Sequence, residues 1–190
     1  NEFYFDSDQP PLSWATGVIK SVSGREYDMS KAGDKAALMD ESLIAMINQV
    51  RDAIHDIDPS ALVSIGFFAP QEPNPHRVGD LRISRTYAAI WQSEADFIDL
   101  HAYPAGDLTL EKLYENYGVS NMRKIPVIMG EFGAFVPFFD SAESAAQSMV
   151  AWQVDSCELG FDGWLIWTWD DSTVGEVLPA LAGQGQIAEW

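Results

Sequence analysis

The clearest chemical signal in this sequence is Glu131, which follows a short apolar run at residues 125–129. The run does not alternate between apolar and polar residues, which is typical of a strand covered on both faces. Gly130 and Gly133 flank the carboxylate and allow other backbone or a ligand to come close. A carboxylate at the C-terminal tip of a buried parallel strand lies where a (β/α) barrel carries its chemistry. The pattern also fits a Glu that caps the next helix or pairs with a buried Arg, so both interpretations stay open.

Four segments resemble motifs of one enzyme family. The segment Pro-Val-Ile-Met-Gly-Glu-Phe-Gly around Glu131 resembles the nucleophile strand of glycoside hydrolase family 5, the cellulase family, in the clan of retaining (β/α)8 glycosidases. Asn1-Glu2 resembles the Asn-Glu pair that ends the fourth barrel strand of that family. His101-Ala102-Tyr103 resembles its His-x-Tyr at the end of the sixth strand, and residues 163–167 resemble the eighth strand with its sugar-stacking Trp. The four segments occur in the family's order and cover nearly the whole chain.

The resemblance implies a role for each matched polar residue. Glu131 would be the nucleophile that forms a glycosyl-enzyme ester, and Glu2 would be the acid/base that protonates the leaving oxygen and then activates water. Asn1 would donate a hydrogen bond to the sugar 2-hydroxyl. Tyr103 would hydrogen-bond Glu131 and keep it ionised and oriented, and His101 would contact sugar hydroxyls. The alternative for His101 is a histidine whose hydrogen bonds are satisfied within the fold at a strand end.

Aromatic residues of the last predicted strand complete the expected sugar site. By resemblance, Trp167 would be the platform for the sugar at the cleavage point, because an indole face matches the apolar face of a pyranose. Trp169 has the same parity along the strand, so it is expected to face the same cavity, whereas Trp164 has the opposite parity and is expected to pack beneath helices. Asp170 and Asp171 are interpreted as part of a solvated loop, because no matching cluster of ligands accompanies them. We expect no metal and no cofactor.

The chain departs from the family pattern in two respects. Phe3 follows the Asn-Glu pair where the family commonly has Pro. A (β/α)8, or TIM, barrel needs about 250 residues, whereas this chain has 190. We therefore expect residues 1–190 to be the C-terminal portion of one catalytic domain, from the end of barrel strand four to strand eight. An N-terminal barrel portion, in the same or a separate chain, is the expected partner, and without it the 190 residues are expected to aggregate, dimerise or pack loosely and to be inactive.

The rest of the chain alternates between predicted strands and helices, which favours a parallel sheet with helices outside it. Residues 6–35 and 71–79 are predicted loops, because they are rich in Pro, Ser, Gly and Asp. Residues 1–5 are predicted to be a strand end or the loop just beyond it. The other predicted strands lie at 61–68, 96–100, 125–129 and 164–169, and the predicted helices at 43–57, 84–93, 108–117, 140–159 and 175–182.

Apolar spacing predicts which face two of these helices bury. For the first helix the predicted face is Leu43, Met46, Ile47, Val50, Ile54 and Ile57. For the helix after Glu131, the spacing predicts that Ala146, Val150, Val154 and Cys157 are buried, with Asp140 and Glu143 forming a capping box and Gly160 the C-cap.

Composition limits the kinds of partner. The chain has 11 Lys and Arg against 29 Asp and Glu, a formal net charge of −18, which argues against nucleic acid or an anionic membrane. This negative charge is compatible with a neutral substrate, but it is explained equally well by an acidic surface that only confers solubility. Cys157 is the only cysteine, so no intrachain disulfide can form. No apolar run reaches the roughly 18 residues of a membrane span.

The sequence thus predicts a retaining, cellulase-like glycosidase that cleaves β-linked glucan or mannan by double displacement. A polysaccharide substrate implies a secreted or periplasmic protein. One alternative is a non-catalytic fragment of a barrel whose aromatic residues still bind carbohydrate. The other is a (β/α) barrel enzyme of a different class, such as a metal-dependent isomerase or lyase.

Overall fold

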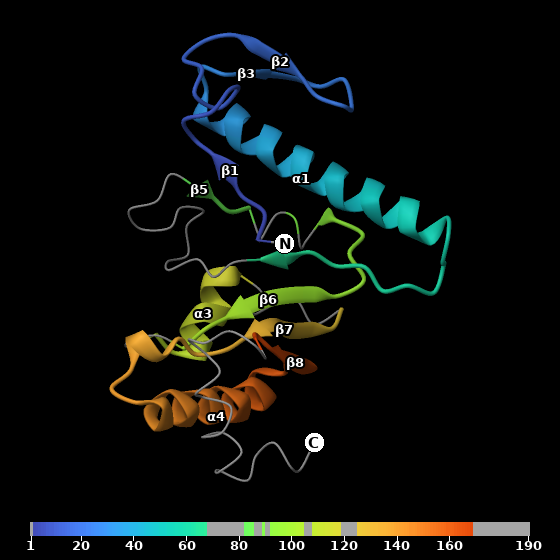
Figure 1. Ribbon diagram of the computed structural model, residues 1–190. Helices are drawn as coiled ribbons and strands as arrows, with labels where there is room; N and C mark the ends of the chain where they lie inside the picture. The colour runs from blue at the N-terminus through green and yellow to red at the C-terminus, as the bar shows by residue number, and fades with distance from the viewer. Residues whose placement is uncertain are drawn as a thin grey trace.

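A four-stranded parallel sheet lies at the centre of the computed structural model (Figure 1). The structure describes residues 2–67, 82–85, 89, 92–104, 108–118 and 125–168, and every structural statement below refers to these residues. The sheet order is β4-β6-β7-β8 and neighbouring strands are parallel. The strands are β4 (Gly66–Phe67), β6 (Ile98–Ala102), β7 (Val127–Phe132) and β8 (Gly163–Ile166). The predicted α/β class with a parallel sheet is confirmed, but the described strands form an open sheet and no closed barrel.

The start of the chain, predicted as a strand end or the loop just beyond it, contributes no strand to this sheet. The strand observed there, β1 (Phe5–Asp6), pairs antiparallel with β5 (Arg82–Ile83) in a separate ribbon. The chain still reaches the parallel sheet just before β1, because the backbone N–H of Glu2 donates to the carbonyl of Gly66 at 2.7 Å. The start of the chain is therefore held beside β4 by a single described backbone bond.

The predicted loop at 6–35 contains regular structure. A hairpin of β2 (Val18–Lys20) and β3 (Glu26–Asp28) precedes α1 (Ala32–His55), which begins well before the predicted helix start at Leu43. The backbone N–H of Asp28 donates to the carboxylate of Asp34 at 2.8 Å, which ties the hairpin to the first turn of α1. Further along this helix, Leu38 packs with Tyr27 and Met29 in a small cluster apart from the core of the sheet.

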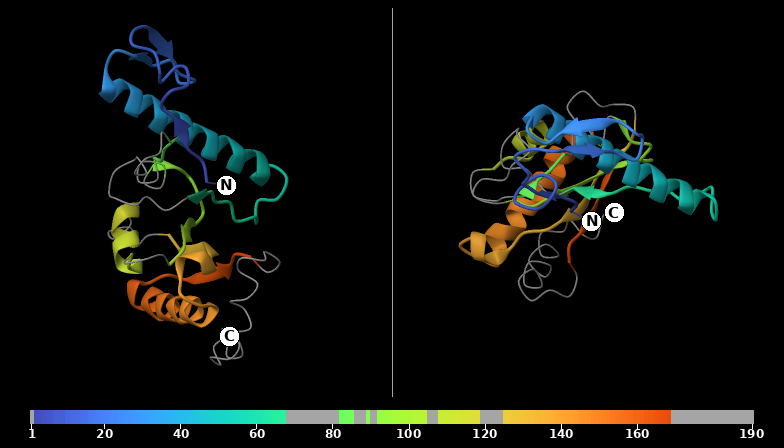
Figure 2. Two further views of the ribbon diagram at one scale, coloured as in Figure 1. Left: turned by 60° about the vertical axis from the view of Figure 1, so that its left-hand side comes forward. Right: turned by 90° about the horizontal axis from the view of Figure 1, so that it is seen from above.

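The buried face of α1 is shifted towards its N-terminal half. Leu38, Met39, Leu43 and Ile47 are its buried residues. Val50 is 51% exposed, and Ile57 lies beyond the helix and is 88% exposed, so the predicted face is wrong at its C-terminal end. Figures 1 and 2 show α1 and the hairpin at one end of the molecule and α4 at the other, with the parallel sheet between them.

The helices that pack on β6, β7 and β8 are α3 (Leu110–Tyr117) and α4 (Ala142–Leu159), with a 3-10 turn η1 (Val136–Phe138) before α4. The predicted end of α3 is confirmed, because Gly118 adopts φ +74° at its C-cap. The predicted C-cap of α4 at Gly160 is also confirmed, with φ +80°.

One prediction for α4 is wrong and one is partly confirmed. The capping box is formed by Ser141 and Ser144, whose hydroxyls each accept the other's backbone N–H at 3.1 Å, and not by Asp140 and Glu143. The predicted buried face is confirmed at Ala146 and wrong at Val154, which is 53% exposed, and at Cys157, which is exposed. The buried residues of the helix are Ala145, Ala146, Met149, Trp152, Gln153 and Ser156.

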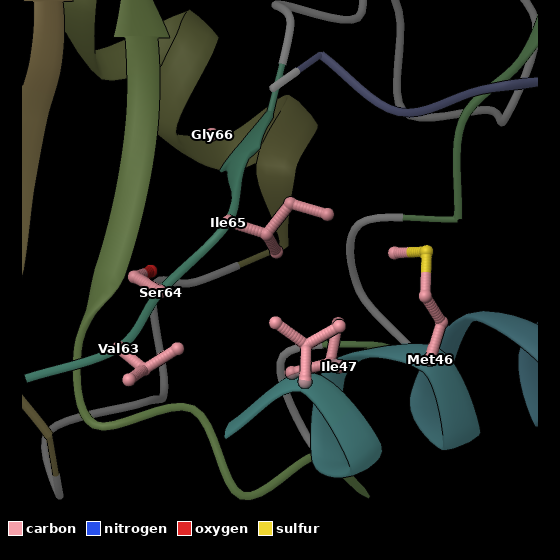
Figure 3. A pocket seen from close by; sticks show the side chains of 7 residues that line it. Met46, Ile47, Val63, Ser64, Ile65 and Gly66 are labelled. Atoms are coloured by element: carbon pink, nitrogen blue, oxygen red, sulfur yellow. The ribbon is translucent and has the colours of Figure 1, made fainter. Parts of the chain in front are cut away.

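An apolar groove of about 400 Å³ separates α1 from the β4 edge of the sheet (Figure 3). Met46 and Ile47 project from the helix towards the extended segment that carries Val63 and Ile65. The groove is lined by Met46, Ile47, Val50, Val63, Ser64, Ile65 and Gly66. None of the described helices is long and apolar enough to serve as a membrane span.

Predictions for the remaining segments fall mainly outside the described residues. This applies to the loop at 71–79 and the helix at 175–182, and to half of the residues of the helix at 84–93. Asn1, Trp169, Asp170 and Asp171 also lie outside them.

Candidate active site

His101 and Glu131 meet because the tips of β6 and β7 lie side by side. The two residues are paired in the parallel register of these strands, just after an irregularity between Asp99 and His101. Their side chains approach to 3.0 Å between Nδ1 of His101 and Oε2 of Glu131. Both side chains are largely buried, with 2% of the His101 side chain and 12% of the Glu131 side chain exposed. The register of two adjacent strands thus creates the centre of the site.

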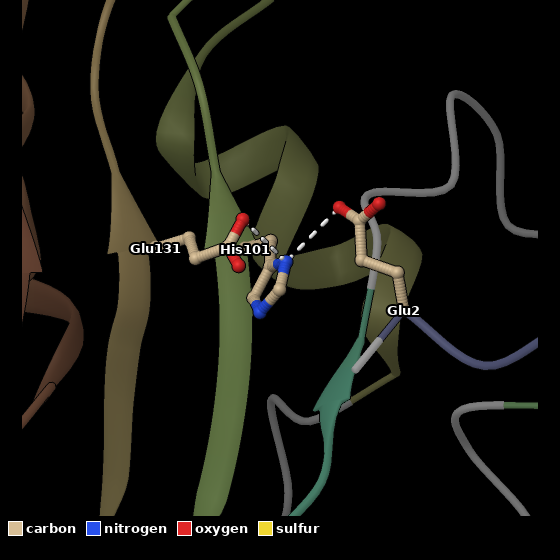
Figure 4. A group of neighbouring side chains, drawn as sticks. All are labelled: Glu2, His101 and Glu131. Atoms are coloured by element: carbon tan, nitrogen blue, oxygen red, sulfur yellow. Dashed lines mark hydrogen bonds and ion pairs between the residues drawn. The ribbon is translucent and has the colours of Figure 1, made fainter. Parts of the chain in front are cut away.

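Glu2 brings a second carboxylate to the same imidazole (Figure 4). Its Oε1 atom lies 3.0 Å from Nδ1 of His101, so this one nitrogen contacts both carboxylates. The three ligand-type atoms of Glu2, His101 and Glu131 all lie within 4.8 Å of one another. The side chain of Glu2 is 40% exposed, which makes it the more solvated of the two carboxylates.

Tyr103 fixes the orientation of Glu131. Its hydroxyl donates to Oε2 of Glu131 at 2.8 Å, and its ring stacks on Phe135 with the centroids 5.0 Å apart. Burial, and then the hydrogen bond to Glu131, raise the pKa of Tyr103 well above its ordinary value near 10. Tyr103 therefore remains a protonated donor at any ordinary working pH. The predicted contact between Tyr103 and Glu131 is present.

Tyr117 holds the end of β6 in place, and sequence reasoning missed it. Its hydroxyl contacts two carbonyl oxygens, at 2.6 Å to His101 and 3.0 Å to Phe67. Tyr117 is only 1% exposed, so these bonds cross the buried interface between α3 and the sheet. One side chain on a helix thereby positions the backbone that carries the imidazole. The sequence gives no sign of this, because the tyrosine fits the apolar face of a helix.

Asp99 is a second residue that pattern analysis did not single out. Its Oδ1 atom is buried, has no hydrogen-bond partner among the described residues, and lies 3.9 Å from Nε2 of His101. Burial raises the pKa of Asp99, the charge of His101 opposes this, and the carboxylate of Glu131 adds to it. A Cβ atom on Gly130 would come within 1.8 Å of this Oδ1, so Gly130 makes the room for the carboxylate. A lone Asp within an apolar strand, next to a Gly of the following strand, is the signal that could have revealed it.

The two tryptophans of the last described strand differ in exposure. Trp164 is partly buried and packs on Phe132, with ring centroids 6.0 Å apart, so its predicted packing role is confirmed. Trp167 is 45% exposed, and its backbone N–H donates to the carbonyl of Phe132 at 2.9 Å. A Cβ atom on Gly133 would lie 2.0 Å from the carbonyl oxygen of Trp167, so this close backbone approach requires glycine. The sugar contact of Trp167 stays a prediction.

The geometry concentrates three carboxylates, those of Glu2, Asp99 and Glu131, around one imidazole. Two of them, Glu2 and Glu131, share the same ring nitrogen, whereas Asp99 lies behind the opposite nitrogen. Such a group can transfer protons, can place a carboxylate nucleophile beside a proton donor, or can coordinate a cation. Of the site residues predicted from the sequence, the structure brings together Glu2, His101, Tyr103 and Glu131.

No protein-family model and no curated protein sequence matches the chain. Two solved structures resemble it. One is the hyperthermostable endo-1,4-β-D-mannanase from Thermotoga petrophila RKU-1 with maltose and glycerol, at 18% identity and a TM-score of 0.47, with 68% of this chain covered. The other is an endo-β-1,4-mannanase from Thermotoga petrophila, at 17% identity and a TM-score of 0.46, with 80% of this chain covered. The chain spans 41% and 42% of the lengths of these two proteins. A likeness at this level does not assign an activity.

Proposed function

We propose that this chain carries the catalytic carboxylates of a retaining glycoside hydrolase that acts on β-linked glucan or mannan. The observation that carries the proposal is the pair Glu2 and Glu131, whose oxygens lie within 4.8 Å of each other on either side of His101. Retaining glycosidases keep their two carboxyl groups about 5–5.5 Å apart, whereas inverting enzymes need roughly 6.5–9.5 Å to admit a water. The short separation favours the retaining mechanism.

In the proposed first step, a carboxylate oxygen of Glu131 attacks the anomeric carbon, and the bond from that carbon to the leaving oxygen breaks. Glu2 transfers its proton to this oxygen, so the leaving sugar departs as a neutral alcohol and Glu131 becomes a glycosyl ester. In the second step, Glu2 removes a proton from water, the water oxygen attacks the anomeric carbon, and Glu131 leaves as a carboxylate. The two inversions together retain the configuration.

The surroundings of the two carboxylates support this division of roles. Glu131 accepts a hydrogen bond from the hydroxyl of Tyr103 and contacts His101, which fixes the position of its carboxylate. Glu2 lies at the more open side of the cluster, where a leaving sugar and then a water can reach it. One fixed carboxylate beside one accessible carboxyl group is the arrangement that two-step glycoside hydrolysis requires.

We further propose that the parallel sheet belongs to a (β/α)8 barrel of family 5 type, in which residues 1–190 supply the end of strand four to strand eight. The parallel order β4-β6-β7-β8, with Glu2 bonded beside β4, supports this topology. Polypeptide outside these residues would supply the other strands. The apolar groove between α1 and β4, beside the exposed Val50, is a surface on which such a neighbour would pack.

The substrate on this proposal is a neutral polysaccharide, and the protein acts outside the cytoplasm, as a secreted or periplasmic enzyme. The net charge of −18 is compatible with an uncharged glycan. Mannan is also the substrate in the names of the two Thermotoga petrophila enzymes. Trp167, with 45% of its surface exposed, is the aromatic residue that we assign to the sugar at the cleavage point.

The test is hydrolysis of aryl β-glucosides and β-mannosides by residues 1–190 together with the polypeptide that supplies the other barrel strands, in the presence of a chelator. Proton NMR of the first-formed sugar gives the stereochemistry, and we expect retention. Glu131→Ala should abolish turnover, and azide should partly restore it with a product of inverted configuration. Binding of oligosaccharide without hydrolysis would favour a carbohydrate-binding fragment, and activity lost on chelation would favour a metal-dependent barrel enzyme. Full activity of Glu131→Ala would remove the assignment.

A further inference from the structure

We propose that the triad of Glu2, His101 and Glu131 binds one divalent transition-metal ion, best fitted by Zn²⁺, in the place that the scissile bond would occupy. Nδ1 of His101 lies 3.0 Å from Oε1 of Glu2 and 3.0 Å from Oε2 of Glu131. All three ligand atoms lie within 4.8 Å of one another. In a tetrahedral zinc site with bonds of about 2.0–2.2 Å, ligand atoms are roughly 3.3–3.6 Å apart. Small side-chain rotations therefore close the triad around one ion.

The shared nitrogen is the first reason to expect a cation here. Nδ1 of a histidine carries at most one hydrogen, which points well towards only one acceptor at a time. Two carboxylate oxygens nevertheless lie at hydrogen-bonding distance from this one atom. A metal ion bound to Nδ1, Glu2 and Glu131 would satisfy all three ligands at once and would offset the repulsion between the two carboxylates.

Asp99 supplies the second reason. Metal-binding histidines usually direct the other ring nitrogen at a carboxylate or carbonyl, which fixes the tautomer. Nε2 of His101 lies 3.9 Å from Oδ1 of Asp99, a buried oxygen without a hydrogen-bond partner among the described residues. A proton on Nε2, the nitrogen that faces this oxygen, would leave the lone pair of Nδ1 directed at Glu2 and Glu131. Tyr103 orients the second ligand, because its hydroxyl donates to Oε2 of Glu131 and fixes the position of that oxygen.

The ligand types select the ion. One imidazole and two carboxylates suit Zn²⁺ and its transition-metal neighbours, whereas Mg²⁺ and Ca²⁺ prefer oxygen ligands alone. Three protein ligands leave the fourth tetrahedral position for water or a sugar hydroxyl. An ion in this position occupies both carboxylates of the proposed hydrolysis, so Zn²⁺ acts as a competitive inhibitor. The inhibition rests on the proposed function, but the binding rests only on the geometry.

The test is isothermal titration of the chelator-treated protein with ZnCl₂ at pH 7, repeated with MgCl₂. We expect one high-affinity Zn²⁺ per chain and no matching site for Mg²⁺. Glu2→Gln and Glu131→Gln should each weaken zinc binding by at least 10-fold, and Asp99→Asn by roughly 10- to 100-fold as for other outer-shell partners. Glu41→Gln is the matched control, because Glu41 pairs with Tyr27 in the hairpin region and its loss should leave the zinc site unchanged.

Unchanged zinc affinity in Glu2→Gln and Glu131→Gln, or equal binding of Mg²⁺, would overturn the proposal. A folded wild-type protein that binds no Zn²⁺ would also overturn it. Zinc binding in a protein that hydrolyses no glycoside would refute the proposed function and leave the metal site standing. In an active protein, Zn²⁺ should raise KM for an aryl glycoside without lowering kcat, and a chelator should reverse the effect.

Discussion

Removal of one oxygen atom, by Tyr103→Phe, tests whether the nucleophile depends on its hydrogen-bond donor. The substitution deletes the hydroxyl that donates to Oε2 of Glu131 at 2.8 Å. The ring that stacks on Phe135 stays in place. Because burial and Glu131 raise the pKa of Tyr103 above its ordinary value, the wild-type hydroxyl donates across the whole working pH range. The variant should therefore differ from the wild type at every pH.

A hydrogen bond to a charged group contributes about 1.5–3 kcal/mol. If the whole of this is lost from the transition state, kcat/KM for an aryl β-glycoside should fall by roughly 10- to 150-fold. The assay is initial-rate kinetics from pH 4 to pH 9, together with a thermal melt. We expect the melting temperature to fall no further than in the Tyr27→Phe control below, because each variant loses one tyrosine hydroxyl and keeps its ring.

Tyr27→Phe is the matched control. It removes a tyrosine hydroxyl that donates to another glutamate, Glu41, in the hairpin region (Figure 1). This variant should lose stability and keep its kcat/KM per folded molecule. If Tyr103→Phe retains kcat/KM within 2-fold of the wild type, or if both variants lose activity equally, the hydrogen bond to Glu131 does not have the role assigned to it.

Two further predictions concern packing and charge. Trp164→Ala should cost about 3 kcal/mol of stability, the low end for an aromatic core site, because Trp164 is only partly buried. Trp167→Ala should weaken sugar binding and leave the melting temperature nearly unchanged. Swapped phenotypes in melts and kinetics would show that the strand register is misassigned. Hydrogen bonds from Arg51 lower the pKa of Asp96, so this carboxylate stabilises the fold above the unfolded pKa near 3.9 and loses that effect as the pH falls. Asp96→Asn should therefore cost about 1.5–3 kcal/mol at pH 7 and less at pH 3 in thermal melts, and an equal loss at both pH values would contradict this cause.

The sequence was sufficient to predict the sheet and the centre of the site, because both follow from strand tips. Apolar runs located β6, β7 and β8 within a few residues. Parallel strands place their C-terminal ends at one edge, so His101 and Glu131 could be expected to meet. The contact between Tyr103 and Glu131 is predicted by the resemblance to family 5 and not by strand geometry.

Features that depend on packing between elements could not be predicted. The buried face of α4 includes the polar residues Gln153 and Ser156, whereas hydrophobic spacing favoured the adjacent face with Val154 and Cys157. The position of Asp99 depends on Gly130 in the neighbouring strand, because any side chain at residue 130 would clash with the Asp99 carboxylate. A pattern within one strand cannot show this. The backbone bond from Glu2 to Gly66 joins segments that are far apart in the sequence. The role of Glu2 in the site could be inferred only by resemblance.

The most direct test of the central claim is mass spectrometry of the protein after reaction with a 2-deoxy-2-fluoro-β-glycosyl fluoride of glucose or mannose. The account predicts that one fluorosugar becomes attached per chain, through an ester at Glu131, and that peptide mapping places it on the peptide containing residues 125–134. Glu131→Gln should remain unlabelled, and Glu41→Gln should be labelled like the wild type. A label on Glu2 or on any other residue, or rapid turnover of an ordinary aryl glycoside without any trapped ester, would contradict the claim that Glu131 is the nucleophile.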